Sequence, residues 1–528
     1  MKSPPPANRE AVGLMPETAE PTQQATELPG ASQVAEGDLD DEQLIRSAGR
    51  GAAWQLLGGG WQAIVRIGAS TVLRRVLTPA DFGIVGMAVL ASTFVDVISP
   101  LGMATGLIAK KDTTEEDNCT VFWTNMAVHV AMFAIAVSAA PLVPMFFRYR
   151  RPGELIWVLR AVSLTFLFSG VTTTSRQMLR KRLKFAPLAI VGGARVVVES
   201  GLAVVLAVWG GMTYWALVWA MVIATVLSQL AVFAYARWRP RLLFSLAGFR
   251  YLFRYGINGM GVWILNYFHY NMDYLIVGRI LDATALGLYQ CAYQIPHMVL
   301  WRLAQPASTV IFPALAQVQH SNYRLMAGYL KSVRYTSLLI FPLLVGLAAV
   351  AKPAVLTLWG HQWTPMIPAM QLLCISPAIR CALISLDSIF LCKNRPDIPF
   401  KLGMVKLVFT FAVVGLMAWR WGITGVAGGM VISQLPNALG LYLAFRMTKR
   451  PMGLLRQALV PPLTSAAVCG GAALAASIAI SQTGAPEWVN LIVSTSVGMA
   501  GYLAAMMMWF PKTLGEVEQT VRLVMGLR

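Results

Sequence analysis

Long apolar runs, separated by short polar segments, make up most of the chain. Fourteen of these runs have about the 20 residues that a helix needs to cross a bilayer, and they cover residues 52–76, 82–108, 119–147, 154–176, 186–209, 212–236, 254–279, 284–312, 328–351, 365–391, 399–420, 422–446, 457–480 and 488–510. They lack the alternation of apolar and polar positions that is typical of transmembrane barrel strands. The pattern therefore predicts an all-α polytopic membrane protein, because helices satisfy their own backbone hydrogen bonds in lipid.

The N-terminal segment differs in composition from the apolar runs. Residues 1–48 contain no apolar run and carry a net charge of −6. Such a segment cannot bury enough apolar surface to fold, so we expect a disordered acidic cytoplasmic tail. Because the whole chain has a net charge of +19, the remainder carries +25, which is unusually basic for a sequence with 13% charged residues.

Lysine and arginine are distributed unevenly between the connections. The even-numbered connections carry 22 of them and the odd-numbered connections carry 8. Loops rich in Lys and Arg remain in the cytoplasm. The even connections, the N-terminal tail and the C-terminal residues 511–528 are therefore predicted to be cytoplasmic.

A short motif occurs once in each half of the chain. Residues 75–85 read RVLTPADFGIV and residues 279–289 read RILDATALGLY. The two copies share an Arg, a following Leu and a Gly at matching positions, which predicts an internal duplication. We expect two six-helix lobes at residues 50–240 and 250–446 around a central cavity, with two additional transmembrane helices at 457–510.

Polar residues follow one face of the first run of each predicted lobe. The first run carries Gln62, Arg66 and Ser70, and the seventh carries Asn266, His269 and Asp273. Gln62 falls on Asn266 in the register of the repeat. Spacings of three and four residues keep such side chains on one helix face. The two stripes predict either a wet cavity shared by the lobes, with Gln62, Asn266 and His269 as its polar lining, or a hydrogen-bonded contact between helices.

Charged residues inside the runs are candidates for function, because burying a charge in a membrane is costly. Arg binds phosphate in a bidentate manner and keeps its charge. We therefore expect a cationic cavity that binds anionic groups through Arg66, Arg279, Arg302 and Arg380. Asp273, a few residues from Arg279, is a candidate for ion coupling because its protonation would alter that pairing, and Asp96 is the alternative.

Other charged residues are predicted to have structural roles. Arg195 and Glu199 are four residues apart and are expected to neutralise each other as an ion pair. Helix-end arginines are expected to extend toward lipid head groups, namely Arg74, Arg148, Arg150 and Arg151.

Catalytic and cofactor motifs are missing from the sequence. It contains no H-E-x-x-H, no Walker A, no G-x-S-x-G and no Rossmann glycine motif, and its six cysteines lack metal-ligand spacing. The sequence therefore predicts no enzyme activity, no cofactor, no metal and no nucleic-acid partner. Without a nucleotide site, transport would use an H⁺ or Na⁺ gradient or run downhill.

Four segments resemble one transporter family. They are LTPADFGIVGMA at 77–88, DYLIVGRILDATALGLYQCAYQI at 273–295, FPALAQVQ at 312–319 and FPLLVGLAAVAKPAVLTLWGHQW at 341–363. Over about residues 50–446 the chain resembles the Wzx-type polysaccharide flippases, which are grouped with the MATE exporters and the lipid II flippase.

This resemblance has specific implications. It implies alternating access and a cargo of undecaprenyl-pyrophosphate-linked oligosaccharide, moved across the bacterial inner membrane for exopolysaccharide, capsule or O-antigen synthesis. The implied partners are membrane lipids, this polyprenyl-linked cargo, and the polymerase and glycosyltransferases of the same pathway.

Three other functions fit the sequence less well. An ion-coupled MATE-like antiporter of small molecules would favour acidic residues in its cavity, and this chain has few. A membrane polymerase or glycosyltransferase needs a sizeable outer loop with catalytic acids. A membrane scaffold does not need buried arginines.

Overall fold

The computed structural model describes residues 60–98, 114–181, 185–511 and 515. The predicted tail at 1–48 lies outside these residues, as does the C-terminal segment apart from 511 and 515. The described residues form helices and contain no strand. This confirms the all-α fold class.

Helices of the first half run from residue 60 to residue 236. After a first helix at residues 60–76, they are α2 (Pro79–Ile98), α4 (Glu115–Ala139), α5 (Leu142–Phe147), α6 (Pro152–Lys181), α7 (Phe185–Val208) and α8 (Tyr214–Ala236). Within this half, α6 packs against both α4 and α8, and α7 packs against α8.

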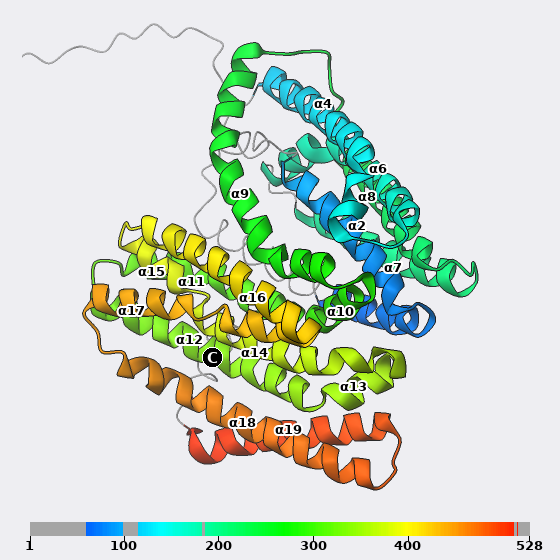
Figure 1. Cartoon of the computed structure of the whole chain (residues 1–528). Helices are drawn as coiled ribbons and strands as arrows, with labels where there is room; N and C mark the ends of the chain where they lie inside the picture. Colours follow the sequence, from blue (N-terminus) through cyan, green and yellow to red (C-terminus); the bar gives the residue numbers. More distant parts are fainter. Residues whose placement is uncertain (1–59, 99–113, 182–184, 512–514, 516–528) are drawn as a thin grey trace, which may run out of the picture. The chain divides into compact units, whose positions relative to one another are not determined.

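The second half begins with the long helix α9 (Leu246–Ile280), which curves along its length (Figure 1). It continues with α10 (Ala283–Val299), η1 (Leu300–Ala304), α11 (Gln305–Gln317), α12 (Asn322–Ala349), α13 (Ala351–Leu358), η2 (His361–Met366), α14 (Ile367–Leu383), α15 (Leu386–Cys392), α16 (Asp397–Ile432) and α17 (Pro436–Thr448). Helix α14 packs between α12 and α16, and α16 also contacts α9.

Two helices follow the second half, α18 (Gly453–Gln482) and α19 (Glu487–Trp509). They lie side by side, and α18 packs along α12 (Figure 1). Both have an exposed apolar surface that includes Leu463 and Met508, as expected for helices that face lipid.

Ten helical segments of the described chain are long and apolar enough to cross a membrane. One of them, Asp397–Thr448, contains two predicted runs, and its helix α16 has non-helical backbone angles at Trp421 and Gly422, at the predicted boundary between them. The first helix, α9 and α10 are not among the ten. The number fourteen is therefore not confirmed, although described helices overlap all fourteen predicted runs.

The two copies of the repeated motif meet directly. Asp282 caps α10 by accepting a hydrogen bond from the backbone N–H of Ala285 at 2.6 Å. At the matching joint, Asp81 accepts a hydrogen bond from the backbone N–H of Thr78 at 2.9 Å. These local bonds end one helix and start the next at the same place in each half.

Glycines allow α2 and α10 to touch at this joint. A Cβ atom on Gly83 would lie 1.8 Å from the carbonyl oxygen of Ala283, and one on Gly287 would lie 1.9 Å from the carbonyl oxygen of Pro79. Gly83 matches Gly287 in the repeat, and Pro79 matches Ala283, so the contact is reciprocal. Two repeat copies that meet through the same residues are related by a local two-fold axis.

Candidate functional site

A cavity of about 510 Å³ lies between the two halves. The first helix, α2, α7 and α8 form its walls from the first half, and α9 and α10 form them from the second. Its polar lining consists of Arg66, Ser70, Arg74, Thr93, Glu199, Ser200, Asn271, Tyr274, Gln290 and Gln294. Arg66, one of the four predicted arginines, lines this cavity.

A second cavity of about 530 Å³ adjoins the first and shares Val89, Thr93 and Met221 with it. It is formed by α2, α4, α6, α7 and α8, with Trp263 of α9. Its polar lining includes Asp96, His129, Arg176, Gln177, Arg195 and Gln229. The two cavities together are called the central cavity below.

Positive charge exceeds negative charge in the central cavity. Its lining contains Arg66, Arg74, Arg176 and Arg195 but only the acids Asp96 and Glu199. The predicted ion pair between Arg195 and Glu199 is confirmed at 3.7 Å. Arg176 donates a hydrogen bond to Oε1 of Gln229 at 2.9 Å. Neither Arg66 nor Arg176 has an acidic partner within 4.0 Å among the described residues, so both charges are available to an anion.

The position of Arg74 differs from the one predicted from the sequence. We expected it to extend toward lipid head groups, but its side chain is only 2% exposed. The guanidinium lies 4.2 Å from the ring centroid of Trp359 and 5.6 Å from that of Trp363, and it donates to Oε1 of Gln294. Stacking on aromatic faces offsets part of the cost of burying this charge. Arg74 therefore joins α13 and η2 to the first half. The other three helix-end arginines do not share this burial: Arg148, Arg150 and Arg151 are exposed.

The coupling candidates occupy different environments. Asp273 is 1% exposed and accepts hydrogen bonds from the Tyr289 hydroxyl at 2.9 Å and the Tyr274 backbone N–H at 3.0 Å. Arg279 instead donates to the backbone carbonyls of Met145 and Phe146, at the end of α5. Asp96 lines the central cavity.

The remaining predicted residues are dispersed. Gln62 is half-buried and faces α7 near Gly193. Asn266 is exposed on α9. Arg302 lies on the π-helical turn η1. The structure thus does not bring the four predicted arginines into one place.

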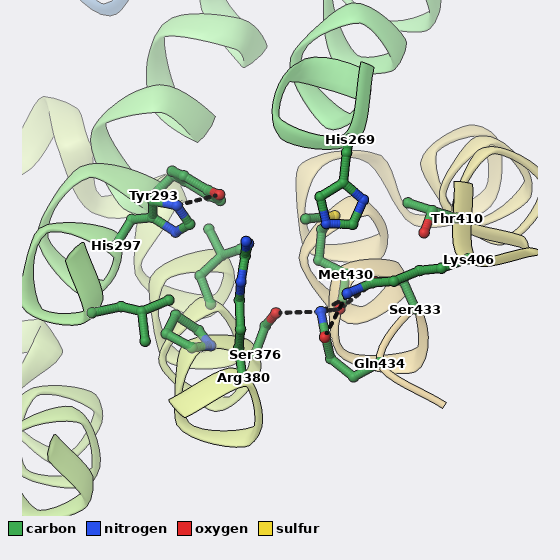
Figure 2. Close-up of a pocket in the computed structure, with 13 residues that line it drawn as sticks. His269, Tyr293, His297, Ser376, Arg380, Lys406, Thr410, Met430, Ser433 and Gln434 are labelled. Atoms are coloured by element: carbon green, nitrogen blue, oxygen red, sulfur yellow. Dashed lines mark hydrogen bonds between the residues drawn. The ribbon is translucent and has the colours of Figure 1, made fainter. Parts of the chain in front are cut away.

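A separate small pocket lies within the second half (Figure 2). It contains two predicted residues, Arg380 of α14 and His269 of α9. Arg380 donates to the Tyr270 hydroxyl at 2.9 Å and lies over that ring at 4.9 Å.

Lys406 of α16, like Arg176 of the central cavity, is not among the predicted site residues. It lines the small pocket, is 9% exposed and donates to Oε1 of Gln434 at 3.2 Å. The available signal was a lysine well inside the apolar run 399–420.

Comparison with known proteins identifies the family. The sequence profile described as "Polysaccharide biosynthesis protein" matches residues 72–368, more than half of the chain. This chain belongs to the polysaccharide biosynthesis protein family of Wzx-type flippases.

Two relatives of this flippase cover most of its length. The teichuronic acid biosynthesis protein TuaB of Bacillus subtilis is 25% identical over 90% of this chain and 98% of its own. The lipopolysaccharide biosynthesis protein WzxC of Escherichia coli is 26% identical over 75% of this chain and 81% of its own. By name, TuaB belongs to teichuronic acid biosynthesis and WzxC to lipopolysaccharide biosynthesis.

Solved structures confirm the fold of the flippase. The lipid II flippase MurJ in an inward closed conformation matches with a TM-score of 0.71 at 13% identity, over 87% of this chain and 99% of MurJ. An inward-facing MATE transporter matches with a TM-score of 0.54 at 15% identity, over 75% of this chain and 96% of its own. The flippase therefore has the fold shared by MurJ and the MATE transporters.

Proposed function

We propose that this flippase moves undecaprenyl-pyrophosphate-linked oligosaccharide repeat units from the inner to the outer leaflet of the bacterial inner membrane by alternating access. The cargo then supplies the polymerase of an exopolysaccharide, capsule or O-antigen pathway. The observation that carries the proposal is the arginine-rich central cavity between the two halves of the chain.

The chemistry of the cargo explains why such a cavity is needed. A pyrophosphate with attached sugars carries charges and hydroxyls that find no partners in hydrocarbon, at a cost of several kcal/mol for each unpaired group. The central cavity offers hydroxyl and amide groups for the sugars and the guanidinium groups of Arg66 and Arg176 for the phosphates. Arginine holds phosphate oxygens in a fixed bidentate geometry.

The cavity charge also separates this proposal from an ion-coupled antiporter of cationic molecules. Glu199 is already paired with Arg195, which leaves Asp96 as the acid available in the cavity lining. An excess of guanidinium groups repels organic cations and attracts anions. An anionic cargo is therefore the better fit.

The proposal includes the membrane arrangement. The lobes at 50–240 and 250–446 move against each other about the joint of α2 and α10, and the helices of 457–510 pack outside them. Both termini lie in the cytoplasm, since the connections rich in Lys and Arg belong on that side. Glycosyltransferases would supply the cargo on the cytoplasmic face.

Deleting the gene tests the function. In spheroplasts of the deletion strain, an antibody or lectin against the repeat unit should find lipid-linked units only after the membrane is permeabilised. A polymerase deletion serves as the matched control, because its unpolymerised units should be reachable from outside. Unpolymerised units on the outer leaflet of the flippase deletion strain would show that the protein acts after translocation and would overturn the proposal.

A further inference from the structure

The small pocket of the second half holds two positive side chains without an ion-pair partner. Figure 2 shows Arg380 of α14 and Lys406 of α16 extending into the same space, with His269 of α9 beside it. Neither forms an ion pair within 4.0 Å in the described part of the chain. Asp387 of α15 is close enough to attract both Lys406 and Arg380 but does not line the pocket. One positive charge therefore remains in excess.

A buried hydroxyl in the pocket also lacks a partner. Thr410 is 6% exposed, lines the pocket, and its Oγ1 makes no hydrogen bond in the structure. Helical threonines commonly donate to the carbonyl four residues earlier, as Thr336 and Thr448 do in this chain. A buried donor left unpaired loses the hydrogen bond it made with water in the unfolded chain. This O–H is therefore free to donate to a ligand.

The size of the pocket limits that ligand. Its volume is about 20 Å³, and a water-sized species occupies roughly 10–15 Å³ on the same measure. A phosphate, a carboxylate or a sugar is too large for this space. A cation is excluded by the two positive side chains, because burying like charges together is costly.

We propose that this pocket binds a small monovalent anion of the halide type, chloride in the cell. Lys406 Nζ, the Arg380 guanidinium and the Thr410 hydroxyl would donate to it, and the anion would neutralise the excess positive charge. The bound anion would connect α14 and α16 across the pocket. The site lies within the second half and lacks every residue of the central cavity, so it does not depend on the identity of the cargo.

Chloride binding to the purified full-length protein in nanodiscs tests this site. Radioactive chloride should bind saturably, and bromide should displace it while inorganic phosphate should not. Thr410→Val, which keeps the side-chain shape, and Lys406→Met should each weaken binding by about tenfold or more. Lys401→Gln is the matched control, because Lys401 is an exposed lysine of the same helix, and it should bind as the wild type does.

Several results would overturn the proposal. They are the absence of saturable chloride binding to the wild-type protein, unchanged binding in both pocket variants, and displacement of chloride by phosphate. Size-exclusion profiles and thermal unfolding identify a variant that does not fold. If Lys406→Met fails this check, Thr410→Val carries the test, because it keeps both positive charges and removes one hydroxyl.

Discussion

Arg75 and Arg279 are equivalent residues of the internal repeat, and each binds the end of a short helix in the opposite half. Arg75 of the first half donates to the backbone carbonyls of Leu358, at 3.1 Å, and Thr357, at the end of α13. Arg279 of the second half donates to those of Met145, at 3.3 Å, and Phe146, at the end of α5. Carbonyls at a helix C-terminus carry partial negative charge, so cations are favourable there.

These two contacts cross between the halves in a reciprocal way. Both lie beside the joint where α2 meets α10, on the side that the Lys and Arg distribution predicts to be external. We infer that they hold the halves together on that side. Arg279 was predicted from the sequence to bind an anionic ligand, but its contacts to α5 favour this joining role instead.

Removing both crossed contacts should separate the halves at this side. We expect the double variant Arg75→Gln and Arg279→Gln to lengthen and broaden the distance between spin labels at Met145→Cys and Lys352→Cys, measured by pulsed electron resonance. Both label positions are exposed, one in each half. The native cysteines are buried except Cys392, which is replaced by Ser.

Arg150→Gln provides the control for this experiment, since Arg150 is an exposed arginine near α5. It should leave the distance distribution unchanged. An unaltered distribution in the double variant would show that the crossed contacts do not hold the halves together.

The reciprocal glycine contact predicts a stability loss. Gly83→Ala and Gly287→Ala each place a methyl group within 2 Å of a backbone oxygen, which forces α2 and α10 apart. Overpacking of this kind costs roughly 1–3 kcal/mol. Thermal unfolding of the purified protein should shift downward for both variants. Gly68→Ala, at a position with no atom within 4 Å of the added methyl, should unfold at the wild-type temperature or above.

The central cavity predicts which arginines transport requires. Arg66→Gln and Arg176→Gln should each lower the transport rate by about tenfold or more, because a charge-assisted hydrogen bond contributes roughly 1.5–3 kcal/mol. Arg66→Lys should restore only part of the rate, since Lys cannot bind phosphate in a bidentate manner. Each variant is expressed in a strain that lacks the flippase gene, and the exported polysaccharide is measured and divided by the amount of flippase protein.

Arg456→Gln is the control for the cavity arginines. Arg456 is exposed on α18 and lines neither part of the central cavity. Export at wild-type levels in both the Arg66 and Arg176 variants would remove the cationic cavity from the mechanism.

Buried Asp273 predicts the ion dependence of transport. We expect Asp273→Asn to transport at a rate that no longer responds to a proton gradient, because its carboxyl is the acid buried beside Tyr289 at the joint. Tyr289→Phe should change the pH dependence without abolishing it, since it removes one donor and keeps the carboxyl. Transport rates would be measured in proteoliposomes with imposed pH gradients. If the rate of Asp273→Asn responds to the gradient as the wild type does, Asp273 is not the coupling residue and Asp96 becomes the candidate.

The sequence by itself determined the helical class, the positions of the apolar runs, the internal repeat and the family. These properties are local or periodic. Each run must supply enough apolar residues to cross a bilayer, and the turn at Trp421 and Gly422 shows up as a break between two runs. The ion pair of Arg195 and Glu199 was also predictable, because a spacing of four residues fixes neighbours on one helix.

Only the tertiary structure decided which charges share a space. Arg66, Arg279, Arg302 and Arg380 have the same chemistry in the sequence, yet Arg66 lines the central cavity, Arg279 binds α5 and Arg380 joins Lys406. Arg74 sits at a helix end like Arg148 but is buried against Trp359. Spacing along a helix says which face a side chain occupies. The partner on that face comes from another helix, often hundreds of residues away, and is set by how the helices pack.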